Sequence, residues 1–130
     1  MDDDAVELAH QMLDMARTGD AVPLLALVDQ GAPVDLRGAD GNSLLMLAGY
    51  HDHPTLVEAL ASRGADVDLL NDRGQSPLAG AAFKGYTDVA RVLLKAGANP
   101  DLGDPSGRAT AQFFNRAEIS ELIETSSDTD

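Results

Sequence analysis

The residues with the most potential for chemistry form the short run His51-Asp52-His53. Two histidines one residue apart can chelate a metal ion on a strand, but this run lies in a predicted turn between two helices. A zinc site needs three or four placed ligands, and the sequence offers no third ligand at a defined spacing. We interpret the run as a polar turn, with a metal-binding or enzymatic protein as the alternative.

Three aspartates at a constant spacing are the second candidate. Asp35, Asp68 and Asp101 are each followed by leucine and are evenly spaced, since 68−35 = 33 and 101−68 = 33. Carboxylates can act as a general acid and base, but nothing near these three supplies a nucleophile or an electrophile. Aspartates in turns commonly accept hydrogen bonds from backbone N–H groups. We therefore predict that they fix equivalent arms and turns in successive units.

Other catalytic and cofactor chemistry is missing from the sequence. The chain has no cysteine, which excludes disulfides and thiolate sites. The patterns G-x-G-x-x-G, G-x-x-x-x-G-K-[ST], G-x-S-x-G and H-E-x-x-H, which mark nucleotide, nucleophile and zinc sites, do not occur. We predict a protein without enzymatic activity, catalytic residues, metal or cofactor.

The charge of the chain limits its partners. Asp and Glu number 22 against nine Lys and Arg, which gives a formal net charge of −13. Such a field repels phosphate, so nucleic acid and anionic membranes are not expected partners. No apolar run reaches the roughly 20 residues of a membrane span, and the N-terminal sequence MDDDAVELAH is acidic where a signal peptide is basic. We expect a cytoplasmic protein, and the composition favours a bacterial source.

The elements that would position these residues follow a fixed period. Gly41, Gly74 and Gly107 are evenly spaced in the sequence, since 74−41 = 33 and 107−74 = 33. The same spacing relates the pairs Gly31-Ala32, Gly64-Ala65 and Gly97-Ala98. A period in this range is typical of stacked repeats. We predict one domain over 1–130, with units at about 4–37, 38–70, 71–103 and 104–124, and an acidic tail at 125–130.

Each unit is predicted to contain a turn, two helices and an extended arm. In the third unit, Ser76 is placed to cap the first helix and Pro77 occupies its first position. Gly85 makes the turn to the second helix, which Gly97 ends. Asp52 stands where the third unit has Gly85, so we predict a left-handed backbone at Asp52.

The end units depart from this pattern. In the first unit, Asp20 follows a helix-ending glycine and is placed to cap the next helix. In the fourth unit, Gly107 keeps the period, but Ile119, Leu122 and Ile123 come about three residues early. We attribute this to a shorter turn between the two helices. Terminal repeats have one neighbouring repeat only and need a more polar outer face.

This combination of period and motifs resembles the ankyrin repeat. The matching residues of the third unit are Gly74, Ser76-Pro77-Leu78, Ala81-Ala82, Gly85, Val89, Leu93-Leu94 and Gly97-Ala98. The family's Thr-Pro-Leu-His run is replaced by Ser76-Pro77-Leu78-Ala79 and Ser43-Leu44-Leu45-Met46, so its histidine ties between units are reduced. The resemblance covers about Asp4 to Glu124. It implies an all-α solenoid of stacked helix-turn-helix units joined by short β-hairpin-like turns.

The resemblance also implies a binding surface for another protein. In the ankyrin family this surface is concave and consists of the turn tips and the exposed faces of the first helices. Carried across to this chain, the partner-binding residues are Arg37, Asp40, Asn42, Tyr50, His51, Asp72, Arg73, Gln75, Phe83, Lys84, Arg108 and Arg116.

The predicted surface is rich in the residue types that dominate interface energetics, arginine and aromatic residues. Tyr50 and Phe83 occupy equivalent places, since 83−50 = 33, while acidic residues gather on the second helices. We hypothesise an acidic back and a groove that holds an acidic or aromatic segment of another protein. In the alternative, the two rings pack against neighbouring units and the arginines pair with Asp40 and Asp72.

Taken together, the sequence predicts a monomeric, non-catalytic module for protein–protein interaction. Besides the metal-binding or enzymatic alternative, a structural piece that forms oligomers is the third class that the sequence leaves open.

Overall fold

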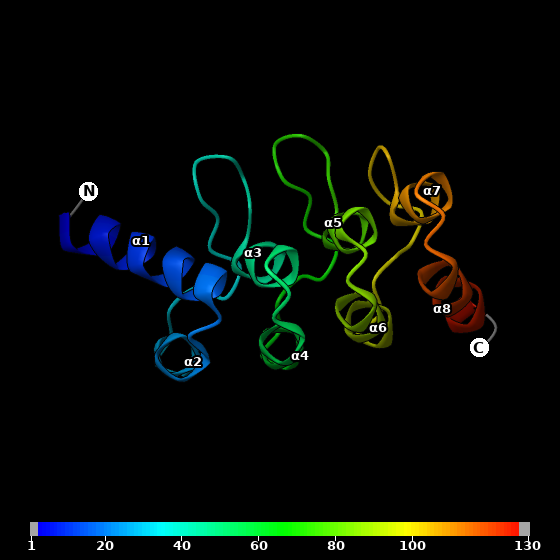
Figure 1. Ribbon diagram of the computed structural model, residues 1–130. Coiled ribbons are helices and arrows are strands. Elements are labelled where there is room, and N and C mark those ends of the chain that lie inside the picture. The colour runs from blue at the N-terminus through cyan, green and yellow to red at the C-terminus, as the bar shows by residue number, and fades with distance from the viewer. Residues whose placement is uncertain (1–2, 128–130) are drawn as a thin grey trace.

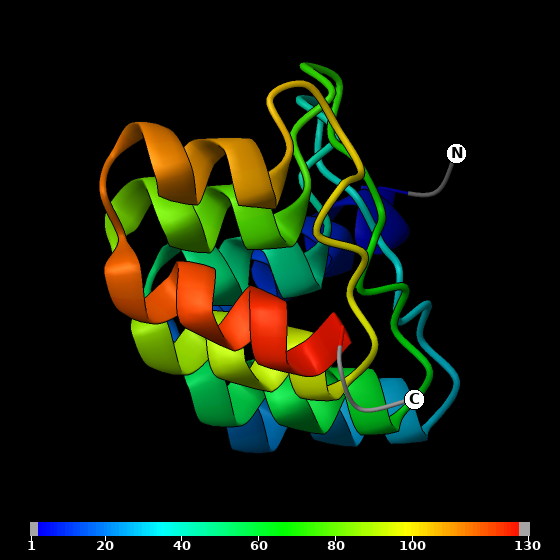
Figure 2. The same cartoon turned by 90° about the vertical axis from the view of Figure 1, so that its right-hand side faces the viewer.

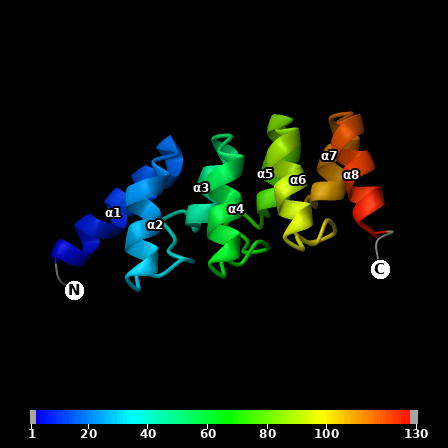
Figure 3. The same cartoon turned by 90° about the horizontal axis from the view of Figure 1, so that it is seen from below.

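Residues 3–127, the part of the chain that this computed structural model describes, contain eight helices in four pairs. Their bounds are α1 (Asp3–Thr18), α2 (Ala21–Asp29), α3 (Leu44–Tyr50), α4 (Pro54–Ser62), α5 (Pro77–Lys84), α6 (Thr87–Lys95), α7 (Gly107–Phe113) and α8 (Ala117–Ser127). The pairs stand side by side in one row, with the first helices in one layer and the second helices in the other (Figure 1, Figure 3). The predicted all-α solenoid is confirmed.

The loops that precede α3, α5 and α7 fold back as narrow fingers (Figure 1). Arg37 and Ser43 form an antiparallel bridge across the first finger, and the N–H of Asn71 donates to the carbonyl of Gln75 across the second. The β-hairpin-like turns of the prediction are therefore present.

Backbone hydrogen bonds also join each finger to the next. The N–H of Asp72 donates to the carbonyl of Asp40 at 3.1 Å, and the N–H of Asp104 donates to the carbonyl of Gly74 at 3.2 Å. The fingers consequently form one continuous wall beside the first helices (Figure 2).

Three serines cap first helices. The hydroxyl oxygens of Ser43, Ser76 and Ser106 each accept a hydrogen bond from the backbone N–H three residues later, at 3.0, 3.0 and 3.1 Å. These caps satisfy donors that a helix start would leave without partners. The predicted cap at Ser76 is confirmed. The predicted cap at Asp20 is wrong, because its side chain makes no capping hydrogen bond to α2.

The turn between the two helices has the same form in all four pairs. Gly19, Asp52, Gly85 and Asn115 have φ angles of 78°, 63°, 76° and 56°, all in the left-handed region. The prediction for Asp52 is confirmed. The residue numbers of successive members differ by 52−19 = 33, 85−52 = 33 and 115−85 = 30. The three residues that the fourth unit lacks are therefore not missing from this turn, and the predicted short turn is wrong.

The shortening lies in the finger before α7. Helix α5 begins at Pro77 and α7 begins at Gly107, so the two starts differ by 107−77 = 30 in residue number. Gly107 is thus the first residue of a helix, whereas Gly74 is a turn glycine with φ of 75°. The prediction that Gly107 keeps the period is wrong for this reason. At the other end of the unit, α8 continues to Ser127, and residues 128–130 of the predicted tail lie outside the described residues.

The core lies between the two helix layers and continues from pair to pair. Its largest fully buried side chains include Leu24, Leu45, Leu60, Leu78, Leu93, Ile119 and Ile123. Small buried residues such as Ala48, Ala81 and Ala82 let the helices approach closely. Burial of apolar side chains against neighbouring units is the main stabilising interaction of such an array.

Two of the periodic aspartates hold one arm to the next. The carboxylate of Asp35 accepts a hydrogen bond from the N–H of Asp66 at 2.9 Å, and that of Asp68 accepts one from the N–H of Asn99 at 2.8 Å. The predicted side-chain to backbone role is confirmed for these two residues. Each bond links consecutive units, so it fixes the spacing of the arms.

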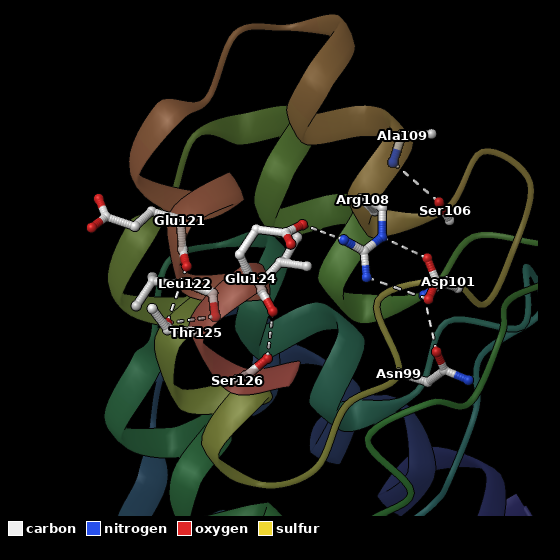
Figure 4. Close-up of polar contacts among 11 residues, drawn as sticks. Asn99, Asp101, Ser106, Arg108, Ala109, Glu121, Leu122, Glu124, Thr125 and Ser126 are labelled. Carbon is white, nitrogen blue, oxygen red and sulfur yellow. Dashed lines mark hydrogen bonds and ion pairs between the residues drawn. The ribbon is translucent and has the colours of Figure 1, made fainter. Parts of the chain in front are cut away.

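The third periodic aspartate pairs with an arginine at the C-terminal end of the row (Figure 4). The Arg108 guanidinium donates to Asp101 at 2.7 Å and also bonds Glu124 of α8. The hydrogen bond from Arg108 lowers the pKa of the Asp101 carboxyl below its ordinary value. Arg108 is the counterpart of Leu78, since 108−78 = 30. The arginine makes ion pairs with Asp101 and Glu124, whereas Leu78 is buried in the core.

Arg116 ties the fourth unit to the third. Its Nε donates to the carbonyl of Ala82 at 3.0 Å, and its Nη2 donates to that of Phe83 at 2.8 Å. These carbonyls belong to the last turn of α5, where helix carbonyls lack intrahelical donors. Earlier in the chain, the His53 ring is placed alike, with its Nε2 2.8 Å from the carbonyl oxygen of Arg17.

Replacing Arg116 with alanine is expected to lower the free energy of unfolding by about 1 to 2 kcal/mol, because two charge-assisted hydrogen bonds between units are lost. Urea unfolding followed by circular dichroism measures the change. The control is Arg91→Ala, whose ion pair with Asp88 is exposed and lies within one helix, and whose effect should stay below about 0.5 kcal/mol. Equal losses in the two variants would contradict a tie between units.

Candidate functional site

A groove of about 740 Å³ runs between the fingers and the first helices. Its floor comes from α3, α5 and α7, and its wall comes from the fingers that stand beside them (Figure 2). The lining residues are Asp40, Asn42, Met46, Leu47, Tyr50, Asn71, Arg73, Gln75, Ala79, Gly80, Phe83, Pro105, Ala109, Thr110, Phe113 and Phe114. The groove therefore extends over three successive units.

Exposed aromatic rings form the floor. Tyr50, Phe83 and Phe113 occupy equivalent positions, since 83−50 = 33 and 113−83 = 30, and they are 38%, 48% and 79% exposed. Phe114 is 40% exposed. Its ring meets those of Phe83 and Phe113 edge to face, with centroids 5.3 and 5.0 Å apart. Large apolar side chains that gather in a concave surface mark an interaction site.

A constant period of 33 conceals two of these rings. Counted from Phe83, it points to 83+33 = 116, which is Arg116, a residue that ties two units together. The true spacing is 30, which points to Phe113, with Phe114 beside it. The sequence did hold a signal, because Ser106 follows Ser76 at the same interval, 106−76 = 30, and both cap a first helix. Matching these caps would have found the aromatic pair.

The wall of the groove is polar and held by its own hydrogen bonds. The Asp40 carboxylate accepts bonds from the backbone N–H and the side-chain amide of Asn42, at 3.1 and 2.9 Å. The Asn71 side-chain oxygen accepts bonds from the N–H groups of Arg73 and Gln75, both at 3.0 Å. The Asn71 amide donates across to Asn42 at 2.8 Å. These bonds fix the backbone of the wall through contacts within the protein itself.

Six of the twelve predicted binding residues line the groove: Asp40, Asn42, Tyr50, Arg73, Gln75 and Phe83. The other six are not among its lining residues: Arg37, His51, Asp72, Lys84, Arg108 and Arg116. Two of these six have partners within the protein, because Arg108 donates to Asp101 and Arg116 donates to a carbonyl at the end of α5. Whether the twelve contribute to binding remains a prediction.

The alternative interpretation was that the two rings pack against neighbouring units and that the arginines pair with Asp40 and Asp72. The structure agrees with it only in part. The Tyr50 ring does lie against the next unit, since a Cβ added at Gly80 would be 3.3 Å from it. Lys84 places its Nζ 5.1 Å from the centroid of the same ring. No ion pair joins Arg37 or Arg73 to an aspartate within residues 3–127. Arg37 and Arg73 of the fingers are therefore not paired with the neighbouring carboxylates.

The histidine run does not form a cluster of metal ligands. The His53 ring is engaged with a backbone carbonyl and packs where a Cβ on Gly19 would be only 2.6 Å away. Desolvation, together with the nearby positive groups His53, Arg17 and Lys84, lowers the pKa of His51. In the described part of the chain, no three His, Asp or Glu residues are grouped so that they could hold a metal ion.

The helices between residues 3 and 127 are all too short or too polar to span a bilayer.

Comparisons with known proteins agree with this architecture. Residues 12–104, well over half of the chain, match the family model for ankyrin repeats in three copies. A protein of Pseudomonas aeruginosa whose name describes it as an ankyrin repeat protein is 46% identical over 57 residues, which are 44% of this chain and 33% of that protein. The matching region thus spans about a third of the relative's length. The chain belongs to the ankyrin-repeat family.

Proposed function

We propose that the protein is a non-catalytic module that binds a segment of another protein in the groove. Ankyrin repeats are generally protein-interaction modules, and the family membership supports this class of function. The observation that carries the proposal is the aromatic floor, where the rings of Tyr50, Phe83, Phe113 and Phe114 face a concave surface while exposed to water. Aromatic residues are enriched among those that dominate binding energies at interfaces.

The groove suits a stretch of polypeptide because its floor repeats from unit to unit. Packed helices lie roughly 8 to 10 Å apart, so α3 and α7 are separated by roughly 20 Å. An extended chain of about six residues covers that length. A segment of this size would meet Tyr50, Phe83 and Phe113 in turn, and the hydrogen-bonding groups of the wall would face its backbone.

We further propose that the protein acts as a monomer in the cytoplasm. The net charge of −13 supports a protein partner over nucleic acid, because phosphates are repelled. A metal-dependent or catalytic role has no specific observation in its favour within the described residues.

The test is the loss of one ring from the floor. Wild-type protein and the Phe83→Ser variant are immobilised, partners are captured from a lysate of the source organism, and the affinity of the captured protein is then measured for each. We expect Phe83→Ser to weaken binding by about 30-fold or more, as for a central interface residue. The matched control is Val22→Ser on α2, at a side chain that is 83% exposed and outside the groove lining. Equal binding by the Phe83 variant would overturn the groove as the binding site.

A further inference from the structure

We infer that the segment bound in the groove presents a carboxylate to Arg73 and an apolar side chain to the rings of Phe83, Phe113 and Phe114. The inference rests on the proposed function and adds the chemistry of the occupant. It follows from the state of the charged residues in the lining and from the arrangement of the rings.

The lining contains two charged residues, Asp40 and Arg73, and only one of them is satisfied. Asp40 accepts two hydrogen bonds from Asn42. The Arg73 guanidinium makes no hydrogen bond and no ion pair within residues 3–127, although the Arg73 backbone N–H is held by Asn71. The finger thus fixes the backbone of Arg73, while the guanidinium of Arg73 stays available. The charged group of the lining that has no partner is therefore positive.

The groove differs in charge from the rest of the molecule. Its lining sums to 1−1 = 0, while the whole chain carries −13. Lys84 adds a positive charge beside the floor, with its Nζ 5.1 Å from the centroid of the Tyr50 ring. A guanidinium binds a carboxylate through two parallel hydrogen bonds. A segment with one carboxylate therefore meets local attraction at Arg73, whereas a long acidic run is repelled by the protein as a whole.

The rings define the second half of the site. Phe114 is held by edge-to-face contacts with Phe83 and Phe113, and the Arg116 guanidinium lies 5.9 Å from the Phe114 ring centroid. The side chain of Phe113, which contacts Phe114, is 79% exposed. Burial of its ring by a partner side chain removes a large apolar area from water, which favours an aliphatic or aromatic residue at this place.

A displayed library of random peptides provides the probe. Peptides are selected on the full-length wild-type protein, and those that also bind the Phe113→Ser variant are removed. We expect the remaining peptides to be enriched in sequences that combine one Asp or Glu with an aromatic or aliphatic residue. Arg73→Ala should weaken the binding of a selected peptide by about tenfold, measured by fluorescence anisotropy, because a charge-assisted hydrogen-bond pair is lost.

Charge reversal makes the test specific. Selection on Arg73→Glu should favour Lys or Arg in place of the acidic residue. The matched control Arg37→Glu changes the net charge equally on the neighbouring finger, outside the lining, and should keep the acidic preference. Peptides that need Phe113 but show no acidic preference, or a basic one on the wild type, would overturn this inference and leave the proposed function standing.

Two other outcomes are decisive as well. If no selected peptide depends on Phe113 or Phe83, both the inference and the proposed function fail. If sedimentation shows a dimer that Phe113→Ser dissociates, the occupant of the groove is a second copy of the chain, and the partner segment inferred above is excluded.

Discussion

Truncation of Leu93 to alanine is expected to lower the free energy of unfolding by about 3 to 4 kcal/mol. Leu93 is fully buried on α6, and α6 packs against α5 in its own unit and against α4 and α8 of the two neighbouring units. The cavity therefore opens where three units share one core. Domains of this size are stable by roughly 5 to 15 kcal/mol, so the loss is a large part of the total. Urea unfolding followed by circular dichroism measures the effect.

Val22→Ala is the control for this change, because the Val22 side chain on α2 is 83% exposed and its truncation should cost no more than about 0.5 kcal/mol. In an array stabilised by contacts between neighbouring units, damage to the third unit should also uncouple the unfolding of the units before it from that of the unit after it. The unfolding transition should then become broader. A loss below about 1 kcal/mol at Leu93, well under the usual cost of such a truncation, would show that the centre of the row is not tightly packed.

The parts of the fold that the sequence predicts well depend either on residues close together in the chain or on the repeat period. Ser76 caps a helix through its own hydroxyl, and Asp52 adopts a left-handed backbone because the turn at that place requires one. Asp35 and Asp68 accept hydrogen bonds from the next arm because each unit repeats the same loop. In these cases one residue and the period are enough, so the solenoid could be predicted without coordinates.

The fourth unit shows where this reasoning fails. A loop can lose three residues without disturbing the helices that it joins, since loops tolerate deletions. The sequence does not say which loop is shorter, because a glycine serves equally as a turn residue and as a residue without a Cβ in a close contact. Gly74 has the first role and Gly107 the second. Giving Gly107 the place of Gly74 displaced the positions of the first helix in this unit by three residues and hid Phe113 and Phe114.

The arginines show a second limit of reasoning from the sequence. Arg108 and Arg116 have the residue type of a binding surface, but their partners are Glu124, Asp101 and the carbonyls at the end of α5. These partners come from other helices or units, and no local pattern pairs them with either arginine. Arg73 is the opposite case, because its side chain has no partner within the described residues. Only the structure separates an arginine that holds units together from one that is free for a ligand.

The shortened finger also connects the fold to the groove. The finger before α7 is three residues shorter than the one before α5, and its Pro105 lines the same groove as Phe113 and Phe114. The floor there is the most exposed part of the aromatic row. The groove therefore has an exposed apolar end at Phe113 and Phe114, and its two ends are chemically different.

Replacing Gly107 with valine is expected to lower the free energy of unfolding by about 3 kcal/mol. A Cβ at this position would lie 2.7 Å from Cγ of Leu78, and Leu78 is itself buried, so it cannot move away without disturbing the core. Overpacking of this kind costs about 1 to 3 kcal/mol, and the branched side chain brings further atoms into the same space. Ala109→Val, two residues later on the exposed side of α7, is the control and should cost less than about 0.7 kcal/mol.

A double-mutant cycle shows whether Leu78 is the cause. Leu78→Ala alone should cost about 2 to 4 kcal/mol because it leaves a cavity, but in the Gly107→Val background it also makes room for the valine. The double variant should therefore be more stable than the sum of the two single losses predicts, by at least about 1 kcal/mol. Additive losses in urea unfolding would mean that Gly107 and Leu78 are not in contact. In that case the start of α7 could not be aligned with the start of α5, and Phe113 and Phe114 would lose their place in the groove.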